Sequence, residues 1–388
     1  LTETAGAKTV GRFTQRVNRI SPKYFIGKGK AEQIVNQAKM LDVNLIVFDD
    51  ELSPTQVRNF MRLAESIKVI DRTALILDIF TQHARTREAK TQVELARLEY
   101  MLPRLTRMWT HLERQMGGIG TRAGAGETQI EIDRRLVRDR ISKLQKEMKG
   151  IEKERETQSR RREKKFRISL VGYTNAGKST LLNVLTGADV YIKDQLFATL
   201  DTTVRSLALD RKHKVLISDS VGFIRKLPHS LVASFKSTLK EAVDSDLLLL
   251  VVDASSRLLD EQLETVKEVL TSIGTRGKET VVVANKIDLL TPAELRGLKD
   301  RFPHAIFISA QNHLRLDALL ERMKKSLESS YQTAEVTFSA SLGKEIASVY
   351  ERVEVLEQDY QSDEVHLKIR GNSSVIEQIV AQSEDGEA

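Results

Sequence analysis

The sequence predicts a multidomain α/β protein whose central part is a doubly wound sheet domain. Three observations lead to this fold class. The chain has 388 residues, which is too long for one ordinary domain. Apolar strand patterns alternate with helices over residues 166–330, and a glycine-rich turn joins the first of these strands to a helix. The remaining parts differ in pattern, so we expect a small N-terminal α/β domain (1–88), a helical arm of two long antiparallel helices (89–165) and a small C-terminal α+β domain (331–388).

Composition excludes several classes of protein. Hydrophobic residues make up 40% and charged residues 30% of the chain, which is typical of folded globular proteins. There is no Cys, so disulfides, thiolate metal sites and Cys nucleophiles are excluded. The longest apolar run, Leu247 to Val252, is far shorter than the ~20 residues of a membrane-spanning helix. We therefore expect no membrane span and a cytoplasmic protein.

In the N-terminal domain, residues 24–80 alternate short β-like runs with amphipathic helices. One helix start is well marked, because Ser53 is a good N-cap, Pro54 suits the first helical position and Gln56 completes a capping box. The segments AEQIVNQAKM and the one starting at Pro54 are the expected helices. The β-like runs are YFIG, LIVF, KVI and TALILDIF.

The arm consists of two helical patterns, residues 91–116 and 129–165, separated by a loop with five Gly between Gly117 and Gly126. Pro103 should kink the first helix. Residues 131–165 contain 14 Lys or Arg and 8 Asp or Glu, so this segment carries +6 of the chain's net charge of +7. A solvated helix face laced with ion pairs and a nucleic-acid contact both explain such a charge run. The expected apolar stripe of the second helix is Leu136, Ile141, Leu144, Met148 and Ile151.

A phosphate-binding loop follows the first strand of the central domain. The segment GYTNAGKS matches the pattern GxxxxGK[ST], and a helix follows it. Glycines let the loop direct its backbone N–H groups at phosphates, while Lys178 reaches the β- and γ-phosphate oxygens and Ser179 ligates Mg²⁺. We infer that this domain binds a nucleoside triphosphate with Mg²⁺.

Three further motifs follow at the ends of predicted strands. The segment KVLISDSVGF supplies Asp219, which reaches Mg²⁺ through water, and Gly222, whose N–H contacts the γ-phosphate. The segment NKID supplies Asp288, whose carboxylate accepts hydrogen bonds from guanine N1–H and N2–H₂, donors that adenine lacks. Asn285 and Lys286 brace this pocket, and Ser309 with Ala310 forms a loop over the base. The nucleotide is therefore GTP.

The residues that drive hydrolysis are less clearly marked. Switch I is expected within residues 189–205, between the first helix and the next strand of the central domain. It needs a Thr that binds Mg²⁺ and the γ-phosphate, and we choose Thr199, with Thr202 and Thr203 as competitors. Phe223 follows Gly222 where many signalling GTPases have a water-orienting Gln, so intrinsic hydrolysis should be slow. A partner's residue, or a monovalent cation such as K⁺ held near Asn175, would then assist; the alternative role of Asn175 is to brace the loop.

Over residues 20–370 the chain resembles the HflX-type ribosome-associated GTPases, in the Obg-related branch of translation-factor GTPases. The likeness includes YFIGKGKAEQI, FDDELSPTQVRN, the GGIGTR and GETQIEIDRR segments, FATLD and DSVGFIRKLP. It implies a GTPase that binds the large ribosomal subunit and its rRNA in the GTP state, splits stalled or idle ribosomes, and is stimulated there to hydrolyse GTP. It also implies that the loop Gly117 to Gly126 lies near the peptidyl-transferase centre.

The resemblance assigns residues to roles that agree with the motifs. The catalytic residues are Lys178, Thr199 and Gly222, and the Mg²⁺ ligands are Ser179, Thr199 and, through water, Asp219. The switch I threonine remains open, because LDTTVR lacks the Pro expected after the Asp. The expected GTP-binding residues are Gly172, Tyr173, Thr174, Asn175, Ala176, Gly177, Lys178, Ser179, Thr180, Phe197, Ala198, Thr199, Asp219, Ser220, Val221, Gly222, Asn285, Lys286, Asp288, Ser309 and Ala310.

Two other functional classes remain as alternatives. One is a GTP-controlled rRNA-binding assembly factor that uses hydrolysis only to time its release and does not split ribosomes. The other, a P-loop metabolic kinase, is disfavoured by the NKID motif. We expect a monomer in the cytoplasm that associates transiently with ribosomes or membranes.

Overall fold

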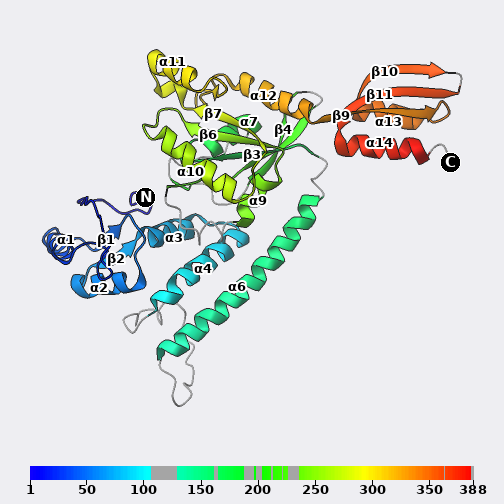
Figure 1. Cartoon of the computed structure of the whole chain (residues 1–388). Coiled ribbons are helices and arrows are strands. Elements are labelled where there is room, and N and C mark those ends of the chain that lie inside the picture. The colour runs from blue at the N-terminus through cyan, green and yellow to red at the C-terminus, as the bar shows by residue number, and fades with distance from the viewer. Residues whose placement is uncertain are drawn as a thin grey trace.

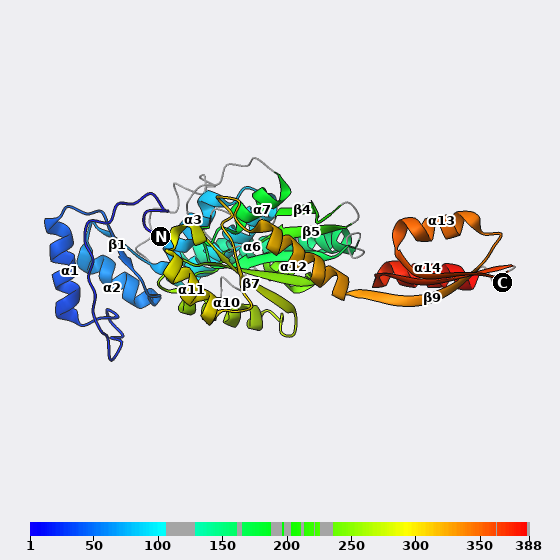
Figure 2. The same cartoon turned by 90° about the horizontal axis from the view of Figure 1, so that it is seen from above.

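The computed structural model describes residues 1–105, 129–160, 165–187, 196–197, 203–210, 213–220, 222–225, 236–361 and 363–385. Its architecture is the predicted one: an N-terminal α/β domain, a helical arm, a central six-stranded domain and a C-terminal α+β domain (Figure 1). Viewed from above, the N-terminal and C-terminal domains lie at opposite ends of the central domain (Figure 2).

The N-terminal domain is built on two parallel strands, β1 (Leu45–Phe48) and β2 (Lys68–Asp71). Helices α1 (Lys28–Met40) and α2 (Pro54–Ala64) lie where the sequence predicts them. The capping box is confirmed, because the Ser53 hydroxyl accepts from the Gln56 N–H and the Gln56 side chain accepts from the Ser53 N–H. The strand predicted over YFIG is wrong, since Phe25 makes only an isolated bridge there, with Ser21.

Helix α3 (Arg72–His83) replaces the β-like run predicted over TALILDIF. Asp71 is its N-cap and accepts from the Ala74 N–H at 2.9 Å. The prediction failed because α3 is buried on most sides, against β1 and β2, helix α4 and two segments of the central domain. A helix surrounded in this way carries apolar side chains around most of its circumference, so the helical period disappears from the sequence. Its buried residues are Arg72, Thr73, Leu75, Ile76, Leu77, Ile79 and Phe80.

The arm contains α4 (Arg87–Met101), a 3₁₀ turn (Leu102–Arg104) and α6 (Gln129–Arg160). The α-helical part of α4 ends before Pro103, which lies in the 3₁₀ turn, and residues 106–116 of the predicted first helix lie outside the described residues. The two helices are antiparallel, as shown by ion pairs of Arg140 with Glu94 at 2.8 Å and of Arg87 with Glu147 at 2.9 Å. The glycine-rich loop between them lies outside the described residues.

The packed stripe of α6 differs from the predicted one at one position. Leu136 is 45% exposed, whereas its neighbour Val137 is 4% exposed and packs against α4 with Leu144. Met148 is buried and Ile141 packs at the edge of the same cluster. The predicted stripe therefore lies on the packed face of α6 except at its first member, where Val137 takes the place of Leu136.

The central domain is a six-stranded sheet with the order β4-β5-β3-β6-β7-β8. All pairs are parallel except β4 with β5, so the predicted doubly wound sheet has one antiparallel edge strand. Its strands are β3 (Arg167–Gly172), β4 (Thr203–Ala208), β5 (Lys214–Asp219), β6 (Leu247–Asp253), β7 (Glu279–Asn285) and β8 (Ile306–Phe307).

Helices cover both faces of this sheet, which explains the continuous apolar run of β6. Leu247, Leu249 and Val251 face α7 and α12, while the alternate residues of β6 face α9 and α10. The helices are α7 (Lys178–Thr186), α9 (Lys236–Asp244), α10 (Leu259–Ser272), α11 (Pro292–Arg301) and α12 (Leu316–Ser329), with a 3₁₀ turn at Ile287–Leu289.

The C-terminal domain begins directly after α12. Strands β9 (Tyr331–Ser339), β10 (Glu354–Gln361) and β11 (Glu364–Asn372) form an antiparallel sheet with β11 in the centre. Helix α13 (Gly343–Arg352) and helix α14 (Ser373–Asp385) pack on one face of it. The sequence predicts strands near EVTFSA, VEVLEQ and VHLKIR, a helix over LGKEIASVY and then an acidic tail. The strands and α13 are confirmed, whereas most of the expected tail is helix α14.

Candidate nucleotide-binding site

The phosphate-binding loop connects the end of β3 to the start of α7, as predicted. Lys178 is the first residue of α7, and its ammonium donates to the carbonyl oxygens of Gly172 at 3.2 Å and Tyr173 at 3.0 Å. Gly177 has φ +92°, and a Cβ there would lie 2.2 Å from Nδ2 of Asn285. Only glycine fits at this position, because the phosphate loop packs in direct contact with Asn285 of the guanine motif.

Lys178 is buried, and burial lowers its pKa to about 8, while the nearby Asp219 carboxylate acts in the opposite direction. Burial destabilises the charged ammonium, and binding of negatively charged phosphate oxygens would stabilise it. This is the electrostatic condition expected of a lysine whose role is to bind phosphate.

The Mg²⁺ ligands predicted on α7 and β5 lie side by side. The Ser179 hydroxyl donates to Oδ2 of Asp219 at 2.5 Å, and Asp219 is 1% exposed. Ser220 holds the end of β5 to β3 by donating to the Leu170 carbonyl at 2.7 Å. A hydroxyl and a carboxylate next to a phosphate loop form an oxygen donor set that fits Mg²⁺. Thr199, Ala198 and Val221 lie outside the described residues.

The segment that follows β5 and contains Gly222 and Phe223, which we call switch II, packs directly on the phosphate loop. The Thr174 N–H donates to the Phe223 carbonyl at 2.7 Å, and the Phe223 N–H donates to the Gly172 carbonyl at 3.1 Å. A Cβ on Gly222 would lie 2.7 Å from Cα of Thr174, which explains the need for glycine. The Phe223 ring is 2% exposed and points into the core, so it does not orient a water molecule in this arrangement.

Phe197, predicted from the FATLD motif as a nucleotide-binding residue, contacts the phosphate loop through its backbone. Its N–H donates to the Thr174 hydroxyl at 3.3 Å. Its ring is 2% exposed and packs edge-on against Phe80 of α3, with ring centroids 4.7 Å apart. The side chain is therefore held by the N-terminal region of the protein.

The guanine motif connects three loops at the carboxyl end of the sheet. The Asn285 side chain donates to the Ala176 carbonyl and accepts from the Ala310 N–H, both at 2.9 Å. The Ser309 hydroxyl accepts from the Asn312 N–H at 3.1 Å, which stabilises the loop over the base. Asp288 is exposed, which leaves its carboxylate accessible to a base.

Lys286 has a partner that the sequence reasoning missed. Its ammonium forms an ion pair with Asp253 at 2.8 Å, at the end of β6. The available signal was position, because Asp253 ends an apolar strand next to β7 in the same way as Asp219 ends β5. Asn175 is exposed with φ +63°, at the outer side of the phosphate loop.

A phosphate loop, a hydroxyl and carboxylate pair for Mg²⁺ and a guanine-reading motif on a doubly wound sheet define a P-loop GTPase. Comparison with known proteins agrees. Residues 1–81 match the family model described as GTP-binding GTPase N-terminal, residues 83–162 that described as GTP-binding GTPase middle region, and residues 167–286 that described as 50S ribosome-binding GTPase.

The curated relatives identify the family. GTPase HflX of Caldanaerobacter subterraneus is 43% identical over 381 residues, covering 98% of this chain and 87% of that protein. GTPase HflX of Escherichia coli is 43% identical over 376 residues, covering 95% of this chain and 88% of that protein. The chain belongs to the HflX family of GTPases, and it hydrolyses GTP.

A solved structure shows a weaker likeness. A GTP-binding protein of Sulfolobus solfataricus, crystallised in complex with GDP, is 28% identical, with 84% of this chain and 92% of that chain covered and a TM-score of 0.42. Family membership therefore rests on the sequence relatives. Among the residues that the structure describes, no helix combines the length and the apolar character needed to cross a membrane.

Proposed function

We propose that this GTPase binds the large ribosomal subunit in its GTP state, splits stalled or idle ribosomes, and is released by hydrolysis that the subunit stimulates. The observation that carries the proposal is the basic helical arm attached to a GTPase domain of the type described as 50S ribosome-binding. Mg²⁺ serves as the cofactor, with Ser179, Thr199 and water-mediated Asp219 as ligands. Lys178 and Gly222 stabilise charge on the γ-phosphate, and the site of action is the cytoplasm.

The charges of α6 are arranged for contact with RNA phosphates. Arg138, Lys146, Lys149 and Lys153 are exposed and follow helical spacing, so they form one outward stripe opposite the face that packs on α4. Arg140, in contrast, pairs with Glu94 of α4. By sequence the C-terminal domain carries 12 Asp or Glu against 4 Lys or Arg, so its charge disfavours rRNA.

The binding part of the proposal is tested by removing the outward stripe. Replacing Arg138, Lys146 and Lys149 with Gln should weaken binding to large subunits and flatten the log–log salt slope by roughly 0.7–0.9 per contact that is lost. Arg134 is a poorer choice, because its guanidinium donates to the Leu105 carbonyl and supports the arm itself. GTP affinity without ribosomes should not change.

A matched control removes the same charge elsewhere. Lys267, Arg296 and Lys299 are exposed on α10 and α11, away from the arm, and their replacement with Gln should leave the salt slope near the wild-type value. Equal effects of the two triple variants would mean that net charge, and not the arm, determines binding.

Splitting requires a separate experiment. Light scattering of purified 70S ribosomes with GTP should fall when the protein is added. Shortening the loop Gly117 to Gly126 to a tight turn should leave salt-dependent binding but abolish the fall, if the loop acts inside the subunit. Normal splitting by the shortened protein would make the arm an electrostatic anchor only.

The alternative, an rRNA-binding assembly factor that does not split ribosomes, rests on the same basic arm. It predicts subunit-stimulated GTP hydrolysis with no change in light scattering. Measuring both quantities on one preparation therefore separates the two functions. The expected monomer can be checked in the same preparation by light scattering coupled to size exclusion.

A further inference from the structure

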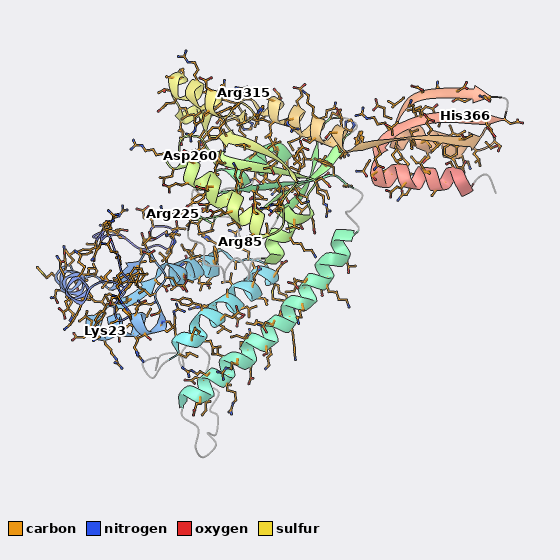
Figure 3. The ribbon with its side chains drawn as sticks, viewed as in Figure 1. Lys23, Arg85, Arg225, Asp260, Arg315 and His366 are labelled. Carbon is orange, nitrogen blue, oxygen red and sulfur yellow. The ribbon has the colours of Figure 1, made fainter. Side chains whose placement is uncertain are left out.

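Helix α3 belongs to the N-terminal domain, yet it contacts both segments of the GTPase domain that respond to the γ-phosphate. At its start, the Arg72 guanidinium donates to the Arg225 carbonyl of switch II at 2.7 Å. Two turns later, Phe80 packs against Phe197 of switch I. Figure 3 shows Arg225 at the boundary between α3 and the central domain.

The peptide units on either side of Arg225 are held from two different domains. The Arg225 N–H donates to the hydroxyl of Tyr173 in the phosphate loop at 2.9 Å, while its carbonyl oxygen accepts from Arg72. Arg72 is 9% exposed, and its other terminal nitrogen forms an ion pair with Asp49. A charged donor in such a buried place makes a stronger hydrogen bond than a neutral one.

This anchoring bears directly on Gly222, three residues before Arg225. Gly222 already lies against Thr174 of the phosphate loop, and Phe223 is bonded to the same loop through both of its backbone groups. Ile224 packs in the apolar cluster around α3. The four residues from Gly222 to Arg225 are therefore held between the phosphate loop on one side and α3 on the other.

We propose that Arg72 is a positioning residue for GTP hydrolysis: by holding the Arg225 carbonyl, it keeps the Gly222 N–H close to the place of the γ-phosphate. Tyr173 holds the other side of the same residue. Ordering switch II before the nucleotide binds reduces the entropy cost of forming the contact with the γ-phosphate. GDP has no γ-phosphate, so the hydrogen bond from Arg72 strengthens GTP binding and leaves GDP binding unchanged.

The test uses the full chain without ribosomes, and it rests on GTP hydrolysis but not on the proposed ribosomal role. Arg72→Ala should lower the single-turnover rate of GTP hydrolysis about tenfold, the equivalent of one charge-assisted hydrogen bond. It should also weaken the binding of a non-hydrolysable GTP analogue, while GDP affinity stays within about twofold. Tyr173→Phe removes the other anchor without touching the N-terminal domain, and it should lower the rate about threefold.

Asp49→Asn is the matched control. It removes the ion pair of Arg72 on the N-terminal domain but leaves the bond to Arg225, so hydrolysis should stay close to the wild-type rate. Arg72→Gln, which keeps an N–H donor, should recover part of the rate. Arg72→Ala with an unchanged or faster rate, with equal losses of GTP and GDP affinity, or with the same behaviour as Asp49→Asn would overturn the proposal. Circular dichroism of each variant checks that the domain remains folded.

Discussion

The two sides of the nucleotide site are supported in different ways. On the base side, Asn285 is bonded to Ala176 and Ala310, and all three residues belong to the central domain. On the switch side, Phe197 and Arg225 are both hydrogen-bonded to the phosphate loop. They also contact α3, which belongs to another domain: Phe197 through its ring and Arg225 through a hydrogen bond. The residues proposed to read guanine are therefore supported within one domain, whereas the switch residues are supported partly by the N-terminal domain.

The largest expected effect is on the base side. Asp288→Asn replaces an acceptor with a donor opposite guanine N1–H, so GTP and GDP affinity should fall by orders of magnitude, and xanthosine triphosphate should bind in their place. Nucleotide competition against a fluorescent GDP measures this. Asp300→Asn, an exposed change on α11, is the control and should have no effect. A variant at position 288 that still prefers GTP would place the base pocket elsewhere.

Asn285→Ala tests whether the base side is a single connected unit. It removes two hydrogen bonds of a side chain that is 3% exposed, so the affinities for GTP and GDP should both fall, by roughly 30- to 100-fold. The equal loss distinguishes this variant from Arg72→Ala, which should affect GTP alone. Asn312→Ala, at an exposed position of the neighbouring loop, provides the control. Selective loss of GTP binding by Asn285→Ala would contradict the division into two sides.

Lys178 links nucleotide affinity to pH. Its pKa of about 8 should rise when the phosphates bind, so binding above pH 8 takes up a proton. The affinity for nucleotide is then highest below pH 8 and falls as pH rises above it. The fall is up to about tenfold per pH unit, until the pKa of Lys178 in the nucleotide complex is reached. Calorimetry in two buffers of different ionisation enthalpy measures the proton uptake. Lys178→Arg, which stays charged throughout, should bind without proton uptake; uptake that persists in it would assign the proton to another group.

The smallest effect concerns monovalent cations on the phosphate side. If Asn175 holds a cation, that cation stabilises the charge of the departing phosphoryl group. Single-turnover hydrolysis should then be a few times faster in K⁺ than in Na⁺, which corresponds to the contribution of about one weak electrostatic contact. Asn175→Ala should remove this preference without changing guanine specificity. Equal rates in the two salts, or a preference that survives the substitution, would leave Asn175 with the role of bracing the loop.

Sequence alone was sufficient to place the residues of the base side and of the phosphate loop. Gly172 to Ser179, Asp219 and Asn285 to Asp288 stand at the ends of apolar strands, and parallel strands bring their carboxyl ends to one edge of the sheet. The capping box at Ser53 and the helices of the arm were predictable for a different reason, because capping hydrogen bonds and helical periodicity act over a few residues.

Only the tertiary structure decided the state of helix α3, the packed face of α6 and the contact between Arg72 and Arg225. Helix α3 looked like a strand because its surroundings, and not its own period, determine where apolar residues are needed. Val137, and not Leu136, faces α4, because the packing of two helices selects among neighbouring apolar side chains. The bond from Arg72 to Arg225 joins residues 153 positions apart. No local pattern encodes such a contact, since it forms only where segments far apart in the chain meet.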